Sequence, residues 1–239
     1  EDALRCASLP DTGERLLLVR RLHLGRLPAG LSSQSLSLLI EQRVLAAGGS
    51  WVHGEHGSAA ESPVVFFASR LQAAQAAVRR RAEGRSLTAW FWRPALHGVQ
   101  IDAGDDEFLH SVIAVQAQES TAPASLPALV ADIVAAGHAD WLIRHMPEET
   151  SRLLLAVSGA QRYMADAMPQ PDAYPSAHTL RYVGRSAAGQ SRQMLLPCAC
   201  PVWLHAVLRA AQWLPEAMLD ASGRVVRTEP IASDAAAPL

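Results

Sequence analysis

The spacing of hydrophobic residues changes from alternation to a helical period near the N-terminus. Over residues 16–27, Leu22 and Leu24 alternate with polar or small residues, which predicts a β-strand ended by the Pro-Ala-Gly turn that follows. From residue 33 to 47, leucine, isoleucine and valine recur every three or four positions. That period predicts an amphipathic helix, capped by serine at its start and ended by two glycines.

Helical spacing dominates the middle of the chain. A helix is expected from Ser69 to the glycine at position 84, after an apolar run at residues 64–67 that fits either a buried strand or the entry to a helix. Acidic residues in first turns and glycines at helix ends mark four further helices. One of them begins at Asp105. The other three are expected at residues 125–136, 140–143 and 147–159. The short connections between them indicate antiparallel helical hairpins.

The chain changes character after residue 168. Prolines, glycines and serines gather between residues 169 and 193, which indicates a linker or long loop with one candidate strand at residues 180–183. A last helix is expected over residues 201–213, and a terminal strand over residues 224–227.

These patterns together predict a mainly α fold, a helical bundle of antiparallel hairpins with a small N-terminal β element. We expect a mainly helical domain with an N-terminal strand over residues 1–168 and a looser C-terminal segment with one helix over residues 169–232. The last residues, 233–239, have too little apolar surface to bury and are expected to form a disordered tail.

Composition excludes several function classes. All 21 basic residues are arginine, so chemistry that needs a lysine amine, such as a Schiff base or a Walker-A lysine, is excluded. The absence of lysine and asparagine beside abundant alanine and arginine indicates a GC-rich, bacterial source. A net charge of −2 argues against a nucleic-acid partner.

Cysteine usage and apolar run lengths indicate the compartment. Cys6, Cys198 and Cys200 are too few and too unevenly placed for a disulfide scaffold, which favours the reducing cytoplasm. No apolar run approaches the roughly 18 residues that a bilayer span needs. We therefore expect a cytoplasmic protein without a membrane partner.

One loop carries the residue types of a zinc site. His53, Glu55 and His56 lie close together, and Cys198 with Cys200 could complete the ligand set. The pattern departs from the zinc-deaminase signature, because the cysteines are separated by one residue instead of two. The histidines also lie on a Gly-rich loop and not on a shared helix face. A surface loop is the favoured interpretation, so we expect no metal and no cofactor.

Two charged clusters have a structural interpretation beside a functional one. Arg79, Arg80 and Arg81 could bind phosphate, but a solvated helix end explains them equally well. The acidic residues from Asp102 to Glu107 could serve acid–base or Mg²⁺ chemistry, although a helix N-terminus also favours them. In both cases we favour the structural interpretation.

Trp90, Phe91, Trp92 and Arg93 form the densest aromatic segment of the chain. Consecutive residues cannot all face one core, so at least one ring should reach a second surface. Tryptophan and arginine are typical of interface hot spots. Both a core role and an interface role stay open for this segment.

Three segments resemble one protein family. Residues 19–28 (VRRLHLGRLP) resemble the opening of tape-measure-like proteins of bacterial contractile injection systems. Residues 141–149, continued through Leu153 and Leu154, resemble helical pieces of those proteins, and residues 84–92 are similar to their short aromatic segments. Tape measures are longer and more continuously helical than this chain. The resemblance implies an assembly role inside a multi-protein machine, and it carries over no catalytic residues.

The sequence thus favours a non-enzymatic interaction or assembly component of a bacterial multi-protein system, with other protein subunits as partners. The observation in favour of an interaction role is the aromatic segment from Trp90 to Arg93. The alternative is a zinc-dependent hydrolase or deaminase-like enzyme that uses the loop from His53 to His56.

Overall fold

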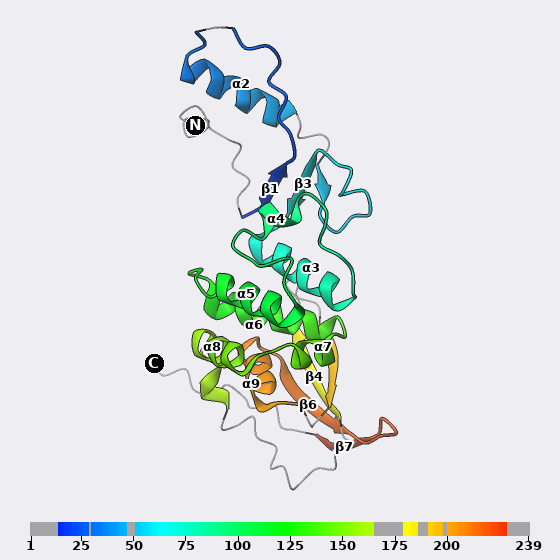
Figure 1. Cartoon of the computed structure of the whole chain (residues 1–239). Coiled ribbons are helices and arrows are strands. Elements are labelled where there is room, and N and C mark those ends of the chain that lie inside the picture. Colours follow the sequence, from blue (N-terminus) through cyan, green and yellow to red (C-terminus); the bar gives the residue numbers. More distant parts are fainter. Residues whose placement is uncertain are drawn as a thin grey trace, which may run out of the picture. The chain divides into compact units, whose positions relative to one another are not determined.

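The computed structural model describes residues 14–28, 30–46, 51–164, 179–185, 191–197 and 200–228. The chain divides into two compact units. Figure 1 labels most of their helices and strands and colours them by sequence position. Unit 1 comprises Glu1–Arg80 and Ser86–His97, and unit 2 comprises Arg81–Arg85 and Gly98–Leu239. The described elements of unit 1 are β1 (Leu16–Val19), α2 (Ser33–Ala46), β2 (Val52–His53), β3 (Val64–Phe67), most of α3 (Arg70–Ala82) and α4 (Trp92–Ala95).

A three-stranded sheet forms the centre of unit 1. Its middle strand is β3, which pairs antiparallel with β1 and parallel with β2. Val65 and Phe67 are fully buried and Val64 is 1% exposed, so both faces of β3 are covered. The apolar run at residues 64–67 is therefore a buried strand, because a strand covered on both faces needs no polar alternation.

The N-terminal alternation has a different role from the one predicted. Only Leu16–Val19 forms a strand, and the leucines that follow pack on a helix instead of continuing the ladder. Ile40 and Val44 of α2 are the buried centre of this small cluster. The partly buried residues packed against them are Leu17, Leu22, Leu24 and Leu36. Alternating leucines on an extended segment thus cover one face of α2.

Unit 2 combines helices and strands. Its described helices are the last residues of α3, α5 (Asp105–Gln116), α6 (Ala122–Ala135), α7 (Ala139–Arg144), α8 (Glu148–Ser158), the 3₁₀ turn η2 (Ala160–Tyr163) and α9 (Val202–Ala210). Its described strands are β4 (Thr179–Arg185), β5 (Ser191–Pro197), β6 (Leu214–Leu219) and β7 (Val225–Thr228).

Several helix ends of unit 2 lie where sequence signals place them. Acidic residues fill the first turns of α5 and α8, and Gly159 ends α8 with φ at 64°. Gly137 ends α6 in the left-handed region, and the next amide, His138 N–H, donates to the Ile133 carbonyl (3.1 Å). Of the helices that the structure describes, none has the length and apolar character needed to cross a membrane.

The four strands of unit 2 form one antiparallel sheet in the order β5-β4-β6-β7. The chain turns sharply from α9 into β6 at Gln212, whose φ of 62° is unusual for a residue other than glycine. Trp213 N–H then donates to the Leu208 carbonyl (2.9 Å), which completes a helix-ending motif. Helix α9 therefore ends before Leu214, where β6 begins.

These two sheets show that the prediction of a mainly α helical bundle is wrong. Helices hold 46% and strands 17% of the confidently placed residues, so the fold is mixed α/β. The sequence patterns missed β2, β5 and β6. Strand β6 contains Pro215 and Glu216, and β5 is built around methionine and leucine, so neither has the β-branched residues that mark a strand.

The domain boundary predicted after residue 168 stays a prediction. That boundary lies outside the described residues, as does the predicted tail at 233–239. Strands β4 to β7 and the helices α5 to α9 belong to one unit. Helix α6 packs against both α8 and α9, which joins the C-terminal elements to the helical layer.

Candidate functional site

The loop with zinc-ligand residue types follows β2 in unit 1. The imidazole Nε2 of His53 lies 3.1 Å from the side-chain oxygen of Gln72. Glu55 forms an ion pair with Arg79 (2.6 Å), and the Nδ1 atom of His56 lies 2.9 Å from the Ser58 hydroxyl. Each of the three side chains therefore has a different protein partner.

The backbone of this loop packs on β3. Gly54 N–H donates to the Phe66 carbonyl (3.0 Å), and the His53 ring contacts the rings of Phe66 and Phe67 edge-on. A Cβ atom at Gly54 would lie 2.1 Å from the Phe67 ring. Glycine at this position is thus required by the aromatic core and not by loop mobility.

The candidate zinc ligands of the alternative hypothesis belong to different units. Cys200 is half-buried and belongs to unit 2, whereas the histidine loop belongs to unit 1. Cys198 lies outside the described residues. Across the described ranges, no group of three histidine, cysteine, aspartate or glutamate side chains has a metal-binding arrangement.

The aromatic segment is largely core. Phe91 is 3% exposed and Trp92 is 2% exposed, and both rings contact Phe67. This burial corrects the interface interpretation for these two residues, because a ring inside unit 1 cannot meet a partner without rearrangement. Trp90 is half-buried, and Arg93 is exposed.

The arginine run does not form a solvated helix end or a phosphate site, because each arginine has a protein partner. Arg79 pairs with Glu55, and Arg80 donates to the Ser86 carbonyl (2.7 Å). Arg79 and Arg81 are two positions apart on a helix, and this spacing places them about 200° apart around its axis. That geometry already argues against one shared ligand.

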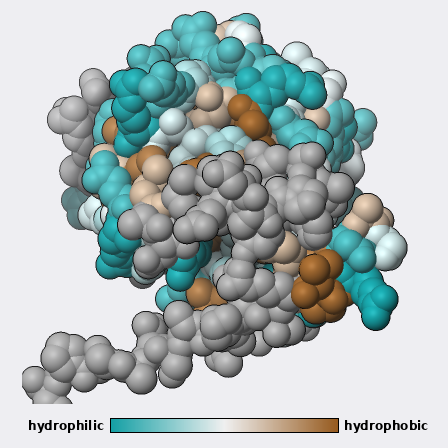
Figure 2. Space-filling view, turned by 90° about the horizontal axis from the view of Figure 1, so that it is seen from below, coloured by the Kyte–Doolittle hydropathy of each residue, from teal (hydrophilic) through white to brown (hydrophobic). Residues whose placement is uncertain are grey.

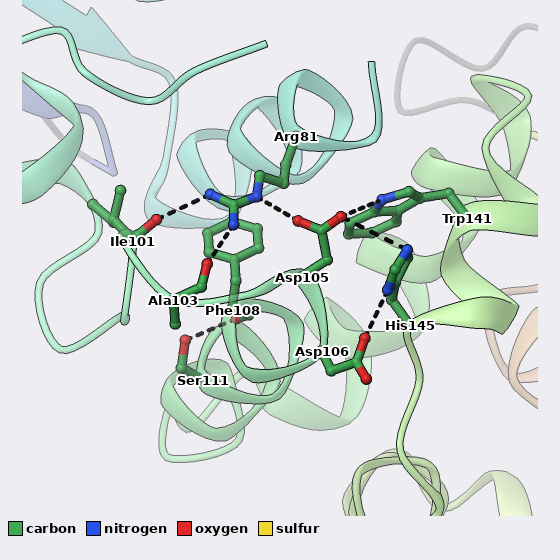
Figure 3. A network of polar contacts seen from close by, with 9 residues as sticks. All are labelled: Arg81, Ile101, Ala103, Asp105, Asp106, Phe108, Ser111, Trp141 and His145. Carbon is green, nitrogen blue, oxygen red and sulfur yellow. Dashed lines mark hydrogen bonds and ion pairs between the residues drawn. The ribbon is translucent and has the colours of Figure 1, made fainter. Parts of the chain in front are cut away.

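Arg81 is the centre of a polar network in unit 2 (Figure 3). Its Nε donates to Asp105 (2.6 Å), and its other nitrogens donate to the carbonyls of Ile101 and Ala103. The guanidinium carbon lies 5.2 Å from the centre of the Phe108 ring. One side chain thus holds the turn before α5 and the first turn of α5.

The same network extends to α7 through Asp105. Trp141 N–H donates to the second carboxylate oxygen of Asp105 (3.3 Å), and His145 lies 2.6 Å from Asp106 and 3.7 Å from Asp105. Burial raises the pKa of Asp105, but hydrogen bonds from Arg81 and Trp141, with the charges of Arg81 and His145, outweigh it and lower the pKa overall.

This network has the character of a structural anchor. In the described part of the chain, the polar contacts of the His145 side chain are both carboxylates, so it has no hydroxyl or thiol to activate. The acidic cluster around Asp105 therefore serves helix initiation and packing, as the structural interpretation predicts.

A second buried pair lies between the sheet and α9. The Tyr182 hydroxyl and the His205 Nδ1 atom are 2.6 Å apart, and the two rings are nearly parallel. His205 is 2% exposed. Burial lowers the pKa of His205 to about 4, although the backbone of Cys200 acts in the opposite direction.

Sequence reasoning did not single out the exposed apolar side chains of the described residues. Five large hydrophobic side chains in the described residues are exposed: Leu27, Leu38, Leu195, Val225 and Val226. Three of them belong to the two edge strands of the unit 2 sheet, β5 and β7. A view toward the end of unit 2 that carries β6 and β7 shows hydrophobic residues at the surface among hydrophilic ones (Figure 2).

Comparison of the chain with protein-family models, curated proteins and solved structures finds no match.

Proposed function

We propose that this chain is a non-enzymatic component of a multi-protein assembly, and that it binds another protein subunit through the edge of the unit 2 sheet. The observation that carries the proposal is the exposure of apolar side chains on edge strands. Leu195 on β5 is 60% exposed, and Val225 and Val226 on β7 are 45% and 56% exposed.

The edge strand β7 has the features of a strand-pairing site. Val226 lies at a register shift between β6 and β7, where it is the extra residue on β7 and regular alternation of side chains is interrupted. Among the described strands, β7 pairs with β6 alone. In the part of the chain that the structure describes, its other edge therefore presents backbone donors and acceptors beside exposed apolar side chains. Such an edge favours the addition of a partner strand.

The energetic gain from covering this edge is substantial. Full burial of a valine or leucine side chain contributes about 1.5–3 kcal/mol. Charged residues lie beside the apolar ones, since Arg181 is the cross-strand neighbour of Leu195 and pairs with Glu216 (2.8 Å). An apolar centre with a polar margin is the usual composition of a protein interface.

The kind of assembly follows from the resemblance of residues 19–28, 84–92 and 141–149. We propose a bacterial contractile injection system or a related machine as the setting, with other protein subunits as partners. The small number of cysteines supports the cytoplasm as the compartment in which the chain folds.

Charge introduced on β7 tests the proposal. Val226→Glu should remove the chain from its complex in extracts of the cells that make it, because an edge charge opposes strand pairing. The matched control is Leu38→Glu on α2, where the replaced side chain is 54% exposed and the chemical change is similar. The native mass of each variant in the extract is the measurement.

Both variants should keep the melting temperature of the unaltered chain within a few degrees, because the replaced side chains are exposed. Loss of the complex in Val226→Glu with its retention in Leu38→Glu supports the proposal. An unaltered complex in Val226→Glu would overturn it.

A further inference from the structure

A surface depression of about 280 Å³ lies at one end of the unit 1 sheet. It is lined by Arg20, Arg21, His23, Glu61 and Pro63. Arg20 and Arg21 follow β1 directly, and Pro63 precedes β3 directly.

The sheet holds the walls of this depression in place. Val19 pairs with Val64 in the last register position of β1 and β3, and Arg20 N–H donates to the Pro63 carbonyl (2.9 Å). One wall thus continues β1 and the other leads into β3. The backbone under the charged side chains is therefore fixed before any ligand binds, which reduces the entropy cost of binding.

The side chains of two arginines and a histidine of the depression have no bonding partner among the described residues. Arg20, Arg21 and His23 are exposed, and in the described residues none of the three side chains forms a hydrogen bond or ion pair. This differs from Arg79, Arg80 and Arg81, each of which is bonded within the protein. A guanidinium group can bind a carboxylate in the bidentate manner that arginine favours, and both arginines line the depression.

Charge distribution favours an acidic ligand. The depression places two arginines and a histidine against one glutamate, in a chain whose net charge is −2. Residues 14–46 contain five arginines and two glutamates, so the positive excess extends beyond the depression. An acidic partner is attracted to this region by long-range electrostatics.

Size and the position of Glu61 favour a protein carboxylate over a nucleic acid. Pockets for drug-sized ligands have volumes of about 300–1,000 Å³, so this one fits a small group such as a side chain. Glu61 repels any anion, but it repels a continuous run of phosphates more than carboxylates that alternate with neutral residues.

We propose that this depression binds the carboxylate side chains of an acidic segment in a partner protein, with Arg20 and Arg21 as the main contacts. This inference rests on the proposed function, because it names the chemistry of a partner. It uses a surface of unit 1, whereas the strand-pairing edge belongs to unit 2.

Fluorescence anisotropy with a labelled octapeptide of alternating Glu and Ala tests the inference on the full chain at low salt. The peptide should bind, and R20Q/R21Q should weaken binding at least about tenfold, since two charge-assisted contacts are lost. The control R144Q/R224Q removes the same charge from two exposed positions of unit 2 and should bind within about twofold of the unaltered chain.

Two further arms use other variants and probes. Glu61→Gln should tighten binding, because a repulsive charge is removed, and this gain of affinity cannot result from misfolding. The peptide with Gln in place of Glu should not bind. An octamer of thymidine should bind more weakly than the Glu peptide.

Equal weakening in R20Q/R21Q and R144Q/R224Q would overturn the inference, as would stronger binding of the oligonucleotide. Failure of the inference and failure of the proposed function are distinguishable. Val226→Glu should bind the peptide normally. Loss of the cellular complex in that variant without any peptide binding by the unaltered chain would reject the depression alone.

Discussion

Some residues that suggest a metal or catalytic site in the sequence serve packing in the structure. The glycine between His53 and Glu55 is the clearest case. In the sequence, Gly54 suggests a mobile loop that could bind a metal. In the structure, glycine is needed there because the buried Phe67 ring occupies the space that a Cβ atom would take. No local pattern reveals this contact, since the ring comes from a strand thirteen residues later.

Alanine at this glycine tests the packing role. Gly54→Ala should lower the free energy of unfolding by about 1–3 kcal/mol, because the fully buried Phe67 ring must shift. Gly57→Ala is the matched control in the same loop, where a Cβ atom would meet nothing within 4 Å. Urea unfolding measures both. Equal stability of the two variants would contradict the steric argument.

A buried imidazole makes stability depend on pH at the residue scale. The pKa of His205 is lowered by burial to about 4, from 6.5 in the unfolded chain. Between these two values the unfolded chain binds a proton that the folded chain does not. Stability from this group is therefore complete above pH 6.5 and is lost as the pH falls toward 4.

His205→Gln should remove part of this pH dependence. Between pH 7 and pH 5, the fall in unfolding free energy should be about 2 kcal/mol smaller in the variant than in the unaltered chain. The control is His97→Gln, at an exposed position, which should keep the full fall. The same pH dependence in all three proteins would show that His205 does not titrate in the way its burial implies.

At the element scale, the sequence predicts helices well and strands poorly. Helix α8 is found within one residue of the prediction because Pro147 and Gly159 mark both of its ends. Strand β6 is missed because Pro215 and Glu216 disfavour a strand by local propensity. The sheet accepts the proline through a shift of register between Arg181 and Tyr182 on the neighbouring strand. Pairing between distant segments decides β6, and a local window cannot show it.

Predictions for the candidate site also succeed where local sequence decides the outcome and fail where contacts between distant segments decide it. The pattern of charges around Asp105 correctly suggests a helix start, but the arginine that binds it is 24 positions earlier. The interface role given to Phe91 and Trp92 is corrected because burial depends on the tertiary fold. The sequence predicts a strand that contains the exposed valines of β7. Their position at a sheet edge becomes visible only when the strand order is known.

The Arg81 network should contribute strongly to the stability of unit 2. Arg81→Gln should lower the free energy of unfolding by about 2–3 kcal/mol, since charge-assisted bonds to Asp105 are lost and two carbonyls lose their donor. The control is Arg85→Gln, whose arginine pairs with Glu83 but is 57% exposed, and it should change stability by less than about 0.5 kcal/mol. Urea unfolding is again the measurement. Similar small losses in both variants would mean that the network is only a surface feature.

At the scale of the whole molecule, the two units present different surfaces. Unit 1 carries a basic depression, and unit 2 carries a sheet edge with apolar side chains. The polar clusters that we describe between Arg79 and His145 are used for internal bonds. Binding to another protein is the role that we propose for the depression and for the sheet edge.

The most direct measurement of this claim is the native mass of the unaltered chain in an extract of the cells that make it. We predict that the chain migrates in a complex well above its own mass of 25.6 kDa. Migration of the whole population at the mass of a single chain would contradict it.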